Sequence, residues 1–175
     1  MRRILLLWMC GFILITGPCI LAAAPPAPTT TSYRDIETVY RRAAFLVMEK
    51  RYQEAIEIFE EINQINPYIA EIHGNLGYLY ETVGQPESAI SEYRTALDIG
   101  PQYSDALNNL GYLLARREEN VTEALELCRQ AVFLDSDNPA YRDSLGYALL
   151  VTGDISEAFI QFERALFYDK ATASA

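Results

Sequence analysis

The chain has 175 residues, half of them hydrophobic, which is enough for one packed domain or one short array of repeats. It carries 24 acidic and 14 basic side chains, for a formal net charge of −10, and it has no strong basic cluster. This balance argues against binding to nucleic-acid phosphates and favours basic proteins or peptides as charged partners.

The N-terminal residues 1–24 form a predicted targeting segment. Arg2 and Arg3 precede an uncharged apolar run over residues 4–24, a pattern typical of a secretory signal peptide. The run is also long enough to span a bilayer as a retained anchor, and Cys19 leaves lipidation open as a third alternative. All three alternatives export the rest of the chain. We therefore expect it to be periplasmic, or anchored to a membrane and facing the periplasm or the exterior.

Residues 25–35 are rich in proline and threonine and predict an extended linker between this segment and the body of the chain. The body, residues 36–172, contains a single cysteine, Cys128. One thiol cannot form an internal disulfide, so the body must be stable through packing alone.

A short motif repeats through the body at nearly constant spacing. "NLGY" occurs at residues 75–78 and 109–112 and "SLGY" at 144–147, so that the glycines lie 34 and 35 residues apart. A period in the thirties is typical of stacked-repeat proteins. The pattern divides the body into four units, namely 36–69, 70–103, 104–138 and 139–172.

Each unit is expected to form two amphipathic helices joined by a tight turn. In the second unit we expect helices over 70–83 and 87–99, and in the fourth over 139–152 and 155–168. Asn138 before a proline predicts a capped helix start. Asn120 and Asp154 each stand three residues before a glutamate, as the first residue of a capping box does.

The repeated glycines predict a close approach of the two helices in a unit. A glycine inside a helix costs about 1 kcal/mol relative to alanine, so Gly77, Gly111 and Gly146 need a compensating reason. A crossing at which a side chain would push the helices apart supplies one. Small and large residues also recur in phase in the second helices: Ala55, Ala89, Ala124 and Ala158, then Phe59, Tyr93, Cys128 and Phe162.

This pattern resembles the tetratricopeptide repeat over about residues 36–170. The second unit matches that motif nearly throughout, with Leu76, Gly77, Tyr80, Ala89, Tyr93, Ala96 and Pro101. The resemblance implies an all-α fold, a right-handed α-solenoid of about four helix hairpins. It also implies a concave surface, formed by the first helices, that binds a peptide or protein segment.

The resemblance also implies which side chains line this concave groove. They are Glu37, Tyr40, Glu71, Tyr78, Glu81, Asp105, Asn108, Tyr112, Asp143 and Tyr147. The tyrosines form one stripe and the acidic residues an edge, which together suit a partner segment with apolar or aromatic anchors and a lysine or arginine. The alternative is that the tyrosines mainly pack between neighbouring repeats.

Nothing in the sequence predicts an enzyme, a cofactor or a metal site. His73 is the only histidine and is expected to be structural, and Cys128 is expected to be an inert core residue. The predicted function is a non-enzymatic adaptor of the cell envelope, in the assembly of a pilus, secretion or outer-membrane complex.

The last predicted helix supports a second hypothesis. Its apolar and aromatic residues Phe159, Ile160, Phe167 and Tyr168 are followed only by a short C-terminal tail, so some of them are expected to be exposed. The alternative function is a structural subunit that docks into an envelope complex through this helix, and self-association is also open.

Overall fold

The computed structural model describes the backbone of residues 30–173 and the side chains of residues 37–169. The predicted targeting segment, residues 1–24, lies outside this range. The helices of the described range are α1 (Thr30–Met48), α2 (Tyr52–Ile65), α3 (Ala70–Thr82), α4 (Pro86–Ile99), α5 (Ser104–Arg116), α6 (Val121–Leu134), α7 (Pro139–Thr152) and α8 (Ile155–Ala173). None of these helices is long and apolar enough to cross a membrane.

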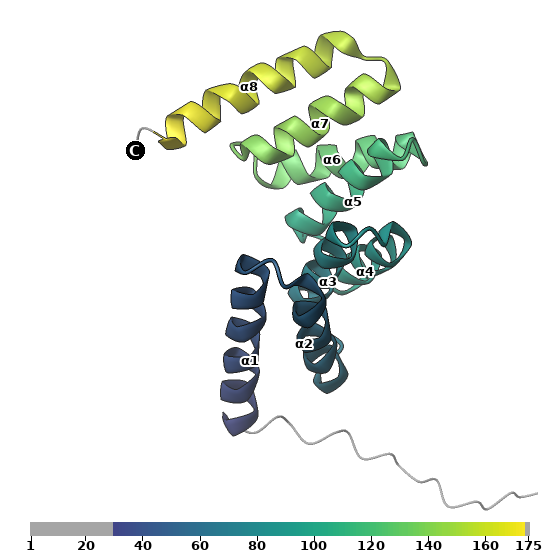
Figure 1. Ribbon diagram of the computed structural model, residues 1–175. Coiled ribbons are helices and arrows are strands. Elements are labelled where there is room, and N and C mark those ends of the chain that lie inside the picture. The colour runs from purple at the N-terminus through teal and green to yellow at the C-terminus, as the bar shows by residue number, and fades with distance from the viewer. Residues whose placement is uncertain (1–29, 174–175) are drawn as a thin grey trace, which may run out of the picture.

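Consecutive helices form four hairpins that stack into a solenoid, with α1 and α8 at opposite ends (Figure 1). The predicted all-α solenoid of four hairpins is confirmed for residues 30–173. One boundary differs: α1 begins at Thr30, so residues 30–35, expected to be extended linker, are helical. No glycine or proline occurs between Thr30 and Met48 to stop the helix from extending toward the N-terminus.

The glycines lie where the two helices of a hairpin come close, as predicted. A methyl group on Gly77 would lie 2.5 Å from the ring of Tyr93, and one on Gly146 would lie 2.7 Å from the ring of Phe162. At Gly111 it would lie 2.9 Å from the backbone oxygen of Ala124. The missing side chain is what allows each second helix to pack this closely.

The core runs along the array between the helices. One cluster of buried residues extends from α4 to α8, and another joins α1, α2 and α3. Their members are the residues that recur in phase, including Ala89, Ala124 and Ala158, each fully buried. Burial repeats with the same period as the sequence, so each unit is stabilised by its neighbours rather than by a core of its own.

The helix ends match the prediction in two cases and contradict it in one. The side chain of Asn138 accepts hydrogen bonds from the backbone of α7, and that of Asp154 accepts one from the backbone N–H of Glu157 at 3.1 Å. Asn120 does not cap α6, because it adopts a left-handed conformation with φ of 45° and its amide donates to Glu123 instead. The extra residue of the third unit lies in this turn, where Glu118 is also left-handed.

Candidate peptide-binding surface

The first helices of the hairpins, α1, α3, α5 and α7, carry the residues expected to form the groove. Tyr78, Tyr112 and Tyr147 occupy equivalent positions on α3, α5 and α7. Tyr78 is 48% exposed, whereas the other two are half-buried and pack edge to face with ring centres 5.4 Å apart. The structure therefore supports packing for Tyr112 and Tyr147, and leaves Tyr78 as the open member of the stripe.

Arg116 lies beside this stripe and was not expected there. Its guanidinium carbon lies 5.5 Å from the centre of the Tyr112 ring, and its Nη1 donates to the Glu81 carboxylate at 3.1 Å. The residue follows Tyr112 by one helical turn on α5, and this spacing is the signal that could have revealed the contact. The chain's own arginine thus occupies a ring face that was expected to accept a partner's cation.

Among the predicted acidic groove residues, Glu81 and Glu37 already have partners within the chain. The carboxylate of Glu81 also accepts from the Tyr93 hydroxyl at 3.4 Å, and burial raises its pKa above the ordinary value. Glu37 is exposed and pairs with Arg41 on the same helix at 2.6 Å. Glu71 is exposed on α3 and has no ion-pair partner among the described residues.

Tyr40 lies at the α1 end of the surface and connects the first two units. Its ring packs edge to face on Phe59, with centres 5.5 Å apart, and its hydroxyl accepts a hydrogen bond from Asn75 at 3.1 Å. The side chain is 37% exposed. Tyr40 thus holds α1 against its neighbours while part of the residue stays accessible to a partner.

Asn108 and Asp143 share one repeat position, and the structure places this position between repeats rather than in the groove. Asn108 is only 7% exposed, so the expectation that it lines an open groove is corrected. The equivalent residue in the second unit, Gly74, is also buried. Asp143 is exposed because no further helix follows α8 in the described chain.

Asp105 also contacts the neighbouring repeat. Its carboxylate accepts a hydrogen bond from the Tyr141 hydroxyl at 2.6 Å, which joins α5 to α7.

Asp143 lines a pocket of about 520 Å³ at the C-terminal end of the array, between α7 and α8. Sequence reasoning did not predict this pocket, although it predicted exposed apolar residues on α8. Phe159, Ile160 and Phe167 are 61%, 45% and 67% exposed, whereas Tyr168 is half-buried.

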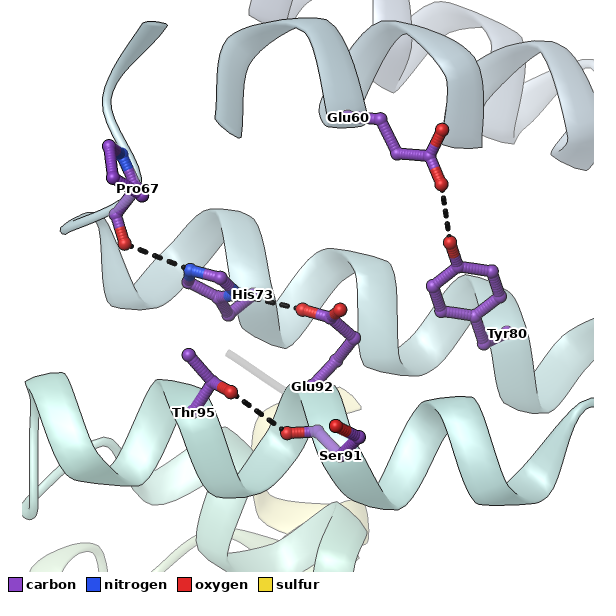
Figure 2. A network of polar contacts seen from close by, with 7 residues as sticks. All are labelled: Glu60, Pro67, His73, Tyr80, Ser91, Glu92 and Thr95. Atoms are coloured by element: carbon purple, nitrogen blue, oxygen red, sulfur yellow. Dashed lines mark hydrogen bonds and ion pairs between the residues drawn. The ribbon is translucent and has the colours of Figure 1, made fainter. Parts of the chain in front are cut away.

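His73 has a structural environment, as expected. It is 5% exposed, and its Nδ1 lies 2.7 Å from the Glu92 carboxylate while its Nε2 lies 3.0 Å from the backbone oxygen of Pro67 (Figure 2). These contacts join α3, α4 and the turn before α3. Nearby, the Tyr80 hydroxyl donates to Glu60 at 2.5 Å and joins α3 to α2.

The metal-ligating side chains and the thiol of the described range can be placed as well. No group of three or more histidine, cysteine, aspartate or glutamate side chains in residues 37–169 could hold a metal ion. Cys128 is fully buried, and burial raises the pKa of its thiol to about 12, so its reactive thiolate is disfavoured at neutral pH.

Comparison with known proteins agrees with the repeat fold described above. The family described as tetratricopeptide repeat matches residues 75–139. Cell division cycle protein 27 homolog A of Arabidopsis thaliana is 31% identical over 86 residues, which are 48% of this chain and 12% of that protein. The matches cover between 7% and 12% of the length of the first three curated relatives.

MamA and YrrB are among the solved structures that share the fold at low sequence identity. MamA superposes with a TM-score of 0.69 at 21% identity, covering 83% of this chain and 84% of that one. YrrB, described as a TPR protein with an unusual peptide-binding site, superposes with a TM-score of 0.63 at 19% identity, covering 76% and 68% of the two chains. Both likenesses concern the fold alone.

Proposed function

Because this chain is a tetratricopeptide repeat protein, we propose that it is a non-enzymatic adaptor that binds a segment of another protein along α3, α5 and α7. The observation that carries the proposal is Tyr78, which is 48% exposed on α3 in line with the half-buried Tyr112 and Tyr147 on the next first helices. Tyrosine offers a large contact area with few rotatable bonds, and it is enriched among the residues that dominate protein interfaces.

The residues around the tyrosine stripe indicate the chemistry of the partner segment that this surface would bind. The rings offer apolar surface, and Arg116 beside Tyr112 offers guanidinium donors to a carbonyl or carboxylate of the partner. Glu71 supplies an exposed carboxylate on α3 for a lysine or arginine. We therefore propose a partner segment with apolar or aromatic side chains, a basic residue near α3 and an acceptor near α5.

We also propose that the adaptor works in the cell envelope. The support is the arginine pair and apolar run of residues 1–24, which suits export with the segment cleaved, retained or lipidated. Assembly of a pilus, a secretion system or an outer-membrane complex fits an exported adaptor. A test is to fuse alkaline phosphatase after residue 35, since that enzyme is active only when exported. An inactive fusion would contradict the envelope location.

Site-specific photo-crosslinking in the native host tests the proposed surface. A photoreactive phenylalanine analogue at Tyr78 is expected to crosslink to a defined partner protein. The matched control is the same analogue at Phe133, which is 88% exposed on α6. The proposal fails if both positions give the same crosslinks, or if Tyr78 gives none.

A further inference from the structure

The C-terminal end of the array presents an apolar pocket that the inner repeats do not leave open. It has a volume of about 520 Å³ and lies between the first part of α7 and the last part of α8. Its lining residues are Pro139, Ala140, Asp143, Phe162, Ala165, Leu166 and Asp169. Leu166 is 61% exposed, and α8 forms the end of the stack (Figure 1).

The equivalent place in the third repeat is filled by a tyrosine from the next helix. Tyr141, in the first turn of α7, is 5% exposed and clusters with Ala131 and the partly buried Val132. Its hydroxyl donates to Asp105 at 2.6 Å and lies 3.2 Å from the hydroxyl of Ser104. In the fourth repeat the equivalents of these four residues line the pocket, namely Ala165, Leu166, Ala140 and Pro139.

The second repeat uses the same arrangement with a different tyrosine. Tyr103 directly precedes α5, and its ring lies where a methyl group on Gly74 would come within 2.5 Å. The side chain of Tyr103 also lies next to Gly100. The equivalents of these two glycines in the fourth repeat are Asp143 and Asp169, which complete the pocket. Both inner repeats therefore receive an aromatic ring from the start of the following first helix.

We propose that this terminal pocket receives an aromatic side chain from the first turn of a helix of another protein, which docks against α7 and α8 as a fifth first helix. The interfaces between the inner repeats define the expected partner. On α7, Tyr141, Leu145 and Ala148 are buried at positions i, i+4 and i+7. The partner helix has an aromatic, a large aliphatic and a small residue at this spacing.

The charge around the pocket adds to this description of the partner. Asp143 is exposed at its edge, in a chain of net charge −10. A tyrosine hydroxyl would find a carboxylate acceptor there, as Tyr141 finds Asp105. A lysine or arginine beside the aromatic residue would also be favoured, because its positive charge would face the carboxylate of Asp143 across the interface.

A second copy of the chain is a poorer occupant, because its α1 lacks the required face. The position of Leu145 on α7 is leucine in α3 and α5 as well, and all three leucines are at most 3% exposed. In α1 this position is Arg42, which is exposed. Head-to-tail stacking would bury a charged guanidinium against apolar side chains, which is costly. The position that carries a buried leucine in α3, α5 and α7 therefore carries a charge in α1.

The test uses a fluorescent, stapled helical peptide that copies residues 138–152, with the staple on the face away from Tyr141, Leu145 and Ala148. Binding to the full-length chain is measured by anisotropy. We expect saturable binding, weakened at least tenfold by Tyr141→Ala in the peptide and by Leu166→Lys in the protein. The matched control Phe133→Lys, at an exposed position of α6, should bind as the wild type does.

Several outcomes would overturn the proposal. Absence of binding by the stapled peptide, or binding that does not depend on its tyrosine, would remove the pocket as an aromatic receptor. Binding that is lost with Tyr112→Ala but kept with Leu166→Lys would place the peptide in the groove instead. A dimer in sedimentation experiments that Leu166→Lys dissociates would make a second copy the occupant. Failure of the groove proposal in the crosslinking experiment leaves this test unaffected.

Discussion

The substitution Gly111→Ala tests the close helix crossing directly. The added methyl group would lie 2.7 Å from the Cys128 sulfur and 2.9 Å from the backbone oxygen of Ala124. A backbone oxygen can move only if α6 moves away from α5. Overpacking of this kind costs about 1–3 kcal/mol, and the better helix propensity of alanine returns about 1 kcal/mol. Because the obstacle is backbone, we expect the upper part of that range, a net loss of about 1–2 kcal/mol.

Gly146→Ala provides the comparison, because there the three atoms nearest to the methyl group all belong to the ring of Phe162, the first at 2.7 Å. Replacing that ring in Gly146→Ala/Phe162→Leu should relieve most of the clash. In contrast, Gly111→Ala/Cys128→Ala should recover little, since the oxygen of Ala124 stays in place. Urea unfolding followed by circular dichroism gives the free energies for both double-mutant cycles. The reasoning is refuted if Gly111→Ala stabilises the chain by about 1 kcal/mol, as alanine does at an open helical site.

Three further predictions concern stability. His73→Ala should cost about 1–3 kcal/mol of unfolding free energy, measured in urea, because it leaves the part-buried carboxylate of Glu92 without its partner; an unchanged midpoint would contradict this. Burial raises the pKa of the Cys128 thiol from 9.0 to about 12, so the unfolded chain loses this proton first as the pH rises. Its contribution to stability is complete below pH 9 and declines between about pH 9 and 12, so alkaline urea titrations should show a loss that Cys128→Ala reduces. Asp154→Ala should cost about 1 kcal/mol and Asn120→Ala clearly less, since only Asp154 caps its helix; equal losses in thermal unfolding would refute the distinction.

The repeat architecture could be predicted because its signals are local and recur in phase. The glycine spacing, the alanines and the breakers placed the ends of α3, α4 and α7 within a residue. The cap at Asn138 was predictable because asparagine before proline acts within one turn. The cap at Asn120 was not, because an inserted residue changed the backbone of that turn, and only the three-dimensional turn determines what the side chain can reach.

The groove was harder to predict because its side chains meet across repeats. The family pattern assigns positions on one helix, but the following helix decides which of them stay open. Asn108 is covered when α7 packs on α5, and its equivalent Asp143 stays open because the described array ends there. Glu81 meets Arg116 across two units, a pairing that no periodic pattern within one helix encodes.

These differences make Tyr78 the cleanest probe of the proposed binding surface. The helix α5 packs much more extensively on α7 than on α3, which explains why Tyr112 and Tyr147 are half-buried while Tyr78 is 48% exposed. Tyr112→Ala removes an aromatic pair and should cost about 1 kcal/mol of stability or more, so any loss of binding would be ambiguous. Tyr78→Ala should lower partner capture with a melting temperature within about 2 °C of the wild type. If Tyr78→Ala instead lowers the melting temperature as much as Tyr112→Ala and leaves capture unchanged, the stripe serves packing, and the α7–α8 end becomes the better candidate for the adaptor's contact.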